Sequence, residues 1–167
     1  MTGADDLGRD PEADAERKAS YLESLNLIER LHRRVLDLIK AELDRVGRQE
    51  VNSVQALLLF NIGDAELTAG ELRTRGYYLG SNVSYNLKKL VEAGYIDHQR
   101  SSKDRRSVRV KLTDDGHAIR RIVDDLYDRQ IRALDRFPDL DVGTFDGLNE
   151  SLRRVERFWS EKLRYRN

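Results

Sequence analysis

The chain has 167 residues, a length that suits one domain with extensions. Its charged residues make up 36% of the sequence and balance to a formal net charge of zero, and it contains no cysteine, which excludes disulfides, thiolate metal sites and a cysteine redox sensor. No apolar run approaches the roughly 18 residues that a membrane span needs, and no signal-peptide pattern opens the chain, so we expect no membrane contact and a cytoplasmic location.

The N-terminal part of the sequence predicts an acidic tail followed by a long helix. Residues 1–15 carry five acids and almost no large apolar side chains, which is typical of a disordered segment. In residues 16–50, apolar side chains from Leu22 to Leu43 recur at helical spacing, and Gly47 ends the pattern. So wide a stripe on a small domain predicts a helix that serves partly as core and partly as a dimerisation interface.

Residues 51–113 predict a helix-turn-helix unit followed by a hairpin. Asn52 or Ser53 caps a helix over residues 54–62, which is apolar on all sides and therefore expected to be buried. Residues 66–68 offer a very short strand. Thr68 and Glu71 then form a capping box for a helix over residues 69–75.

The next helix carries the first group of candidate DNA-binding residues. Val83, Leu87 and Leu90 lie on one face, and Ala93-Gly94 closes the helix. The remaining sides carry hydrogen-bonding and cationic groups suited to base edges and phosphates: Ser81, Asn82, Tyr85, Asn86, Lys88 and Lys89. An ordinary amphipathic helix with a solvated polar face is the alternative interpretation.

A basic hairpin follows directly and carries the second group. Val108, Val110 and Leu112 alternate with polar residues, and Tyr95-Ile96 begins the partner strand. The loop between the strands is polar, and its Lys103, Arg105 and Arg106 are candidates to bind phosphate or the minor groove. We expect Asp104 to orient Arg106 through an ion pair, because phosphate repels a carboxylate.

Positive charge is concentrated in this part of the chain. From Arg73 to Lys111 there are ten Lys or Arg residues against three acids, a local net charge of +7. Because the whole chain is neutral, the remainder is acidic by the same amount. A basic patch on an acidic body attracts phosphate locally and discourages unspecific binding elsewhere.

Residues 114–167 predict two further helices. Thr113 is the expected cap of a long helix that runs to about Phe137, with Asp114 and Asp115 in its first turn. Pro138 and Gly143 interrupt the chain, and a final helix is expected from Thr144 to Leu163. Its apolar residues include large aromatics, among them Trp159.

The sequence lacks the patterns of catalytic and metal sites. Its three histidines are far apart, and it has no HExxH pattern, no Ser-His-Asp signature and no phosphate-binding glycine loop. We therefore predict that the protein is not an enzyme and has no metal ion or other cofactor.

The hairpin also carries a family resemblance. Asp104-Arg105-Arg106, then Leu112-Thr113-x-x-Gly116, resembles the wing of the MarR family of bacterial regulators, and Gly94-Tyr95-Ile96 matches the end of that family's recognition helix. Ser101 and Lys103 depart from the family, whose wings often carry an acid and an Arg there. Residues 51–63 and 77–87 resemble an alphaproteobacterial branch whose known member regulates L,D-transpeptidase genes for cell-wall remodelling.

The resemblance implies a mostly α fold with a small β-hairpin wing, a winged helix-turn-helix in which the first and last helices of two chains intertwine. It implies a homodimer on double-stranded DNA, with residues 114–167 completing the dimerisation region. It also implies a small-molecule effector site between the dimer helices and the winged unit, for which the candidates are Tyr21, Leu25, Ile28, His32, Phe60 and Tyr78.

The leading interpretation is a sequence-specific transcriptional regulator that reads a near-palindromic operator, responds to an effector, and controls cell-envelope or stress genes. The alternative is a winged-helix adaptor whose basic hairpin binds an acidic protein partner. Binding that weakens steeply with salt and prefers one operator favours the first interpretation, whereas weak, sequence-blind binding favours the second.

Overall fold

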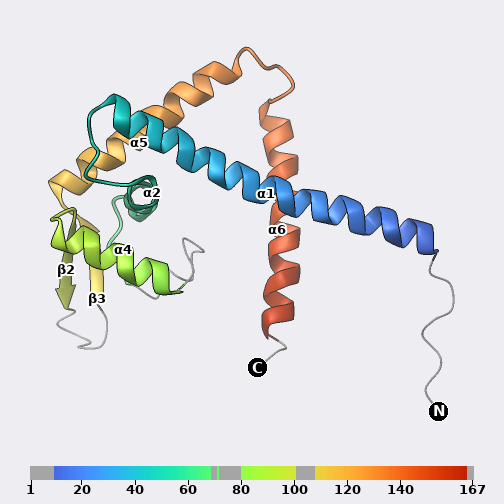
Figure 1. Cartoon of the computed structure of the whole chain (residues 1–167), viewed down its shortest axis with the longest axis horizontal. Helices are drawn as coiled ribbons and strands as arrows, with labels where there is room; N and C mark the ends of the chain where they lie inside the picture. Colours follow the sequence, from blue (N-terminus) through green and yellow to red (C-terminus); the bar gives the residue numbers. More distant parts are fainter. Residues whose placement is uncertain (1–9, 69–70, 72–79, 101–107, 165–167) are drawn as a thin grey trace. The chain divides into compact units, whose positions relative to one another are not determined.

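Over the residues that it describes (10–68, 71, 80–100 and 108–164), the computed structural model contains five helices and a three-stranded antiparallel sheet. For residues 80–83, 98–100 and 108 it describes the backbone alone. Two units divide the chain, Met1–Val123 and Asp124–Asn167, and α5 (Asp114–Leu134) contributes to both. Figure 1 shows the elements in chain order. The mostly α fold class with a small hairpin is confirmed.

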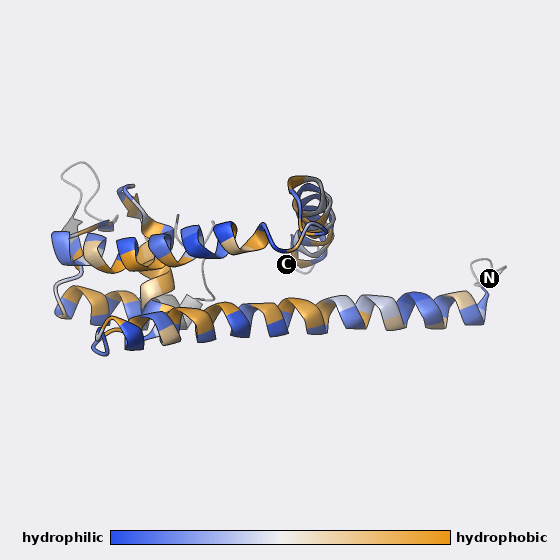
Figure 2. Cartoon of the chain, turned by 90° about the horizontal axis from the view of Figure 1, so that it is seen from above, coloured by the Kyte–Doolittle hydropathy of each residue, from blue (hydrophilic) through white to orange (hydrophobic). Residues whose placement is uncertain are grey.

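Helix α1 (Pro11–Arg45) begins earlier than the sequence predicts. The expectation of disorder up to residue 15 is wrong for residues 11–15, because Asp10 caps the helix by accepting a hydrogen bond from the Glu12 N–H at 3.0 Å. Pro11 suits the first turn, and Glu12 and Asp14 lie at its positive end. Figure 2 shows polar residues dominating this end of α1 and apolar residues recurring along the remainder.

The second helix, α2 (Ser53–Ile62), is the buried centre of the first unit, as predicted. Asn52 is its cap: the Gln55 N–H donates to the Asn52 side chain at 2.9 Å, and the Asn52 N–H donates to the Gln55 side chain at 3.1 Å. Ala56, Leu58 and Leu59 are fully buried. These caps satisfy backbone donors at an end of the helix that leads into a loop.

The sheet has the order β1-β3-β2, with β1 (Leu67–Thr68), β2 (Ile96–Arg100) and β3 (Val108–Leu112). Leu67 pairs with Val110, and Ile96 pairs with Leu112, so the apolar residues of the strands share one buried face. The predicted capping box is confirmed, since Thr68 and Glu71 exchange hydrogen bonds of 2.6 and 3.1 Å. The remainder of the helix expected over residues 69–75 lies outside the described residues.

The core of the first unit is formed by apolar side chains from the end of α1 through to the start of α5. The buried apolar residues of this unit are Ile39, Leu43, Val51, Ala56, Leu58, Leu59, Ile62, Leu67, Leu87, Leu90, Tyr95, Ile96, Val110, Leu112, Ile119 and Val123. They come from α1, α2, α4 (Gly80–Glu92), the sheet and the start of α5. Because α4 and the hairpin both contribute side chains to this core, burial of the apolar surface fixes the two elements relative to each other.

The end of α4 docks on the start of α5 through their backbones. Thr113 caps α5, as predicted: its Oγ1 accepts from the Gly116 N–H at 3.2 Å and donates to the Gly94 carbonyl at 2.7 Å. A Cβ added to Gly116 would lie 2.2 Å from the Tyr95 carbonyl oxygen. Residue 116 is therefore glycine because no side chain fits between the two segments.

The second unit differs from the prediction at both helix ends. Helix α5 stops at Leu134 rather than near Phe137: the Arg136 and Phe137 N–H groups donate to the carbonyls three positions back, which forms a tight turn. Pro138 then disfavours a helical conformation at Phe137. Helix α6 (Val142–Arg164) begins before Thr144, because Asp141 accepts from the Thr144 N–H at 2.7 Å and acts as the cap. Gly143 therefore lies inside the first turn instead of breaking the chain.

Large apolar side chains stay exposed on α1 and α6. No side chain of α6 is buried, although its apolar residues recur at helical spacing. The exposed residues include Leu22, Leu31 and Leu38 on α1 and Phe145, Leu148, Leu152, Phe158 and Leu163 on α6. In the part of the chain that the structure describes, no helix has the length and apolar character required to cross a bilayer.

Replacing Gly116→Ala should destabilise the fold by about 1–3 kcal/mol, because the new methyl group overlaps the Tyr95 carbonyl. Gly147→Ala is the matched control: Gly147 lies inside α6 with nothing within 4 Å of an added Cβ, so this change should be neutral or stabilise by up to about 1 kcal/mol. Urea unfolding, monitored by circular dichroism, measures the unfolding free energy of both variants. Equal effects of the two substitutions would contradict the backbone contact.

Candidate nucleic-acid interface

Helix α4 has one face that packs on the core and one that faces solvent. Leu90 is 1% exposed and Leu87 is buried, whereas Ser84 and Tyr85 are exposed and Tyr85 retains 62% of its accessible surface. Ser81 and Asn82 lie in the first turn, since the helix begins at Gly80, and their side chains lie outside the described part. Asn86 is half-buried, at the border between the two faces.

The cations of α4 are held loosely at its C-terminal end. The Lys89 Nζ lies 3.3 Å from a Glu92 carboxylate oxygen and 6.0 Å from the centre of the Tyr85 ring. The Lys88 Nζ lies 3.8 Å from the other Glu92 oxygen. Exposed pairs of this kind contribute little to stability, so both ammonium groups can exchange Glu92 for a phosphate at small cost. Lys88 and Lys89 therefore lie exposed at the C-terminal end of α4, each near Glu92.

The hairpin presents its cations on the side opposite the core. Val110 and Leu112 are buried, whereas Arg109 and Lys111, which alternate with them, are exposed. Lys111 lies opposite Asp97 in the sheet with 3.8 Å between their charged atoms, and Arg109 lies 4.0 Å from Glu66. The sheet therefore anchors the hairpin and leaves its charges to solvent. The predicted wing residues Lys103, Asp104, Arg105 and Arg106 lie outside the described residues.

Sequence reasoning missed a cluster where the α1–α2 loop meets the end of α4. The Tyr95 hydroxyl donates to a Glu50 carboxylate oxygen at 3.2 Å, and the Arg48 Nε donates to the same oxygen. A backbone hydrogen bond and the Arg48 hydrogen bond lower the pKa of Glu50, and the Glu50 hydrogen bond raises the pKa of Arg48. Glu50 and Tyr95 are 45 positions apart, so no local pattern could have found them.

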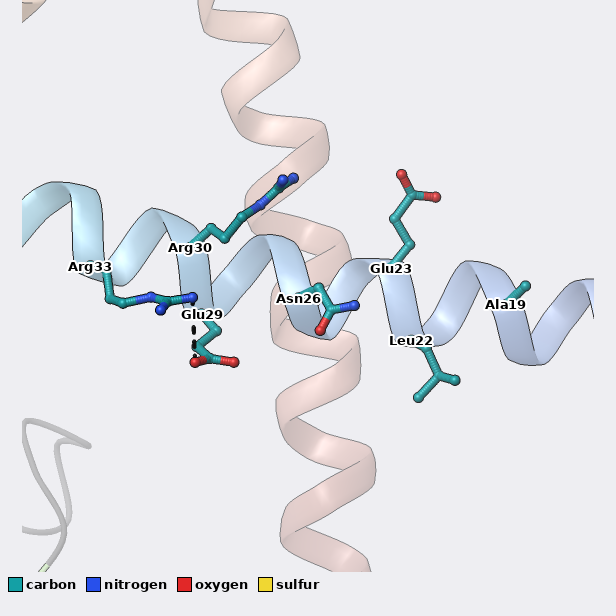
Figure 3. A pocket seen from close by; sticks show the side chains of 7 residues that line it. All are labelled: Ala19, Leu22, Glu23, Asn26, Glu29, Arg30 and Arg33. Atoms are coloured by element: carbon teal, nitrogen blue, oxygen red, sulfur yellow. Dashed lines mark ion pairs between the residues drawn. The ribbon is translucent and has the colours of Figure 1, made fainter.

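The predicted effector residues do not line the three surface cavities described here. The groove in Figure 3 is lined by α1 alone, including an Arg33–Glu29 ion pair of 3.5 Å, and one helix face cannot enclose a molecule. A second cavity lies between the end of α1 and the start of α2, and a third lies at the turn between α5 and α6. Tyr21, Leu25, Ile28, His32 and Phe60 line none of the three, and Tyr78 lies outside the described residues. The effector site stays a prediction.

Among the described residues, no group of three or more His, Asp or Glu side chains is arranged to hold a metal ion.

Comparisons with known proteins agree with the arrangement of α2, α4 and the sheet. Residues 51–116, which contain α2, the sheet and α4, match the family model described as a winged helix DNA-binding domain. The chain resembles Streptococcus pneumoniae FabT solved in complex with DNA, with a TM-score of 0.64 and 19% identity over 84% of this chain and 98% of that one. It also resembles an E. coli MarR variant complexed with operator DNA, with a TM-score of 0.64 and 22% identity over 81% of this chain and 95% of that one.

A curated relative decides the family. The exopolysaccharide II synthesis transcriptional activator ExpG of Rhizobium meliloti (strain 1021) is 37% identical over 146 residues, which cover 87% of this chain and 75% of the relative. The chain belongs to the MarR family of winged helix-turn-helix transcriptional regulators. In this MarR-family chain, α4 occupies the position of the recognition helix in the winged helix-turn-helix fold, and β2 and β3 are the strands of the wing.

The two faces of the recognition helix should respond differently to truncation. Leu90→Ala removes a buried side chain and should cost about 2–5 kcal/mol in unfolding free energy, whereas Tyr85→Ala should change it by no more than about 0.5 kcal/mol. Thermal unfolding of the two variants checks the assignment. A large loss for Tyr85→Ala would mean that Tyr85 packs against the protein and is not presented to solvent.

Proposed function

We propose that this MarR-family regulator acts as a homodimer that binds a near-palindromic operator in double-stranded DNA. The observation that carries the proposal is the exposed polar face of α4, on a helix whose other face is fixed in the core by Leu87 and Leu90. A rigidly held helix with one exposed polar face suits a major groove, and two such helices about one DNA turn apart read the two halves of an inverted repeat.

Each candidate residue has a role set by its chemistry. Asn82 and Ser81 at the start of α4, with Tyr85, Asn86 and Lys88, contact bases or nearby backbone. Lys89 and the wing residues Lys103, Arg105 and Arg106 neutralise phosphates or enter the minor groove. Asp104 positions Arg106. The protein works by binding and not by catalysis, without a metal ion or cofactor.

Exposed apolar surface supports the dimer. The apolar residues of α6, with Phe145, Leu148 and Leu152 at spacings of three and four, make a stripe that stays exposed in a single chain. Leu31 and Leu38, seven residues apart on one face of α1, are also exposed. Apolar surface of this extent marks a protein interface, and a two-fold dimer would bury the same patch of each chain against its copy.

An effector would act by changing the spacing of the two recognition helices. A small molecule can shift this equilibrium only by as much as it binds one arrangement better than the other. We place its site between the dimer helices and the winged unit, with Tyr21, Leu25, Ile28, His32, Phe60 and Tyr78 as the candidate lining residues.

The regulated genes concern the cell envelope or stress. The similarity to an activator of exopolysaccharide II synthesis supports a cell-surface role, as does the resemblance of residues 51–63 and 77–87 to the branch that regulates L,D-transpeptidase genes. Because its target is the chromosome, we place the protein in the bacterial cytoplasm.

Removing the wing cations should weaken binding to every duplex. The double variant Arg105→Ala with Arg106→Ala should lower the slope of log affinity against log salt by roughly one for each phosphate that the wing no longer neutralises. Arg132→Ala with Arg136→Ala is the matched control, since it removes the same charge from exposed residues of α5 and the turn after it.

Titrations by fluorescence anisotropy at several salt concentrations, with an operator selected from random duplexes, measure both slopes. An unchanged slope in the wing variant would remove the wing from the interface. Weak and sequence-blind binding by the wild-type protein would instead favour an adaptor whose hairpin binds an acidic protein.

The dimer depends on the apolar stripe of α6. Leu148→Glu would bury a carboxylate without a partner in the interface and should weaken dimerisation about tenfold or more, with a parallel loss of operator binding. Ser160→Glu adds the same charge to the same helix outside the stripe and should leave dimerisation unchanged. Sedimentation equilibrium measures both, and equal association constants for the two variants would argue against this interface.

A further inference from the structure

Helices α1 and α4 end in the same way. Gly47 and Gly94 both have positive φ angles, +73° and +79°. The residue after each glycine donates its backbone N–H to the carbonyl five positions back: Arg48 to Leu43 at 2.9 Å, and Tyr95 to Leu90 at 2.9 Å. This glycine-dependent end fixes the direction in which the chain leaves the helix, and therefore the position of the residue after the glycine.

Both of those residues meet on one carboxylate. Arg48, which follows the end of α1, and Tyr95, which follows the end of α4, each donate a hydrogen bond to Oε1 of Glu50. Glu50 lies in the short segment between α1 and α2. A single oxygen atom therefore joins the end of the long helix to the end of the recognition helix, and we call these three residues the Arg48–Glu50–Tyr95 joint.

The chemistry of the joint favours a defined geometry over a large contribution to stability. Tyr95 is 7% exposed, so packing restricts its side chain, whereas the Glu50 and Arg48 side chains remain partly open to solvent. Hydrogen bonds to a charged carboxylate are directional, and the bond from the Tyr95 hydroxyl, at 3.2 Å, is long for an O–H donor. An ion pair this accessible to solvent contributes little to the free energy of unfolding. The joint is thus suited to orienting α4 and not to holding the fold together.

The start of α5 holds the same end of α4 through the backbone. The Thr113 N–H donates to the Tyr95 carbonyl at 3.1 Å, beside the Thr113–Gly94 hydrogen bond and the close Gly116 contact. Since α4 has 13 residues, it is about 20 Å long. A tilt of about 10° at its C-terminal end would then move its first turn by roughly 3 Å, given that length. Asn82 and Ser81, in that first turn, would be displaced most.

We propose that the Arg48–Glu50–Tyr95 joint positions the recognition helix relative to α1 and thereby sets how well the protein discriminates its operator from other DNA. The proposal rests on the proposed function, because it assumes that α4 reads bases. Arg48, Glu50 and Tyr95 are positioning residues: they act through α4 and do not touch DNA themselves.

The test combines a distance measurement with a binding measurement. The chain contains no cysteine, so Ala41→Cys on α1 and Ser84→Cys on α4, both exposed positions, accept nitroxide labels cleanly. Labelled chains diluted with unlabelled protein report the α1–α4 distance by double electron-electron resonance, without DNA. The same joint variants, made without the two added cysteines, give the ratio of affinities for a selected operator and a scrambled duplex.

Three variants separate geometry from stability. Tyr95→Phe removes the hydroxyl and keeps the ring, and Glu50→Ala removes the shared acceptor. Both should broaden the distance distribution and lower the operator ratio about fivefold or more, the worth of one base contact, with unspecific affinity and the unfolding midpoint near wild type. Glu50→Gln keeps an oxygen that accepts from Tyr95 and Arg48, so it should restore both readouts most of the way.

The inference is overturned if Tyr95→Phe and Glu50→Ala leave the distance distribution unchanged, or if they change the distance but keep the operator ratio within twofold of wild type. A wild-type protein that selects no operator overturns the proposed function instead. In that case the label distances still show whether the joint holds α4, so the two failures are distinguishable.

Discussion

The contact between the Gly116 and Tyr95 backbones is the constraint on which the remaining structure depends. It allows the start of α5 to lie directly against the end of α4, and Thr113 joins the two segments by bonding to Gly94 and to Gly116. Because Tyr95 also leads into β2, the same contact sets where the hairpin leaves the core. The recognition helix and the wing are therefore placed by one close backbone approach that glycine alone permits.

Around this contact, the apolar side chains are buried and the cationic side chains are exposed. Apolar side chains of α2, α4 and the sheet fill the core, while the cations of α4 and β3 stay exposed and make only weak, partly solvated pairs with Glu92, Asp97 and Glu66. Weak pairs allow phosphate to replace a carboxylate at low cost. A chain with no net charge can thus present a basic surface, since its surplus of acids lies elsewhere in the sequence.

Local signals made much of this predictable from the sequence. The Thr68–Glu71 capping box, the Thr113 cap and the alternation along β3 are each encoded within a few residues, and the structure confirms them. Of the two caps expected for α2, Asn52 or Ser53, the structure has Asn52. The start of α1 was missed because acidic composition outweighed the cap and proline at Asp10 and Pro11. The start of α6 was missed because Gly143 was interpreted as a break, whereas the Asp141 cap tolerates it. The Arg48–Glu50–Tyr95 joint has no local signature, since it forms only when the chain folds.

Chemical protection of guanine N7 on a selected operator is the most direct test of the central claim, that α4 is held so as to enter the major groove. N7 lies in that groove, so methylation reports occupation of the groove itself. If α4 of each chain enters the major groove, two protected clusters related by inverted symmetry are expected, with centres about 10 base pairs or a multiple of that spacing apart. Guanines that stay fully reactive while the protein is bound, or a single protected cluster, would contradict it.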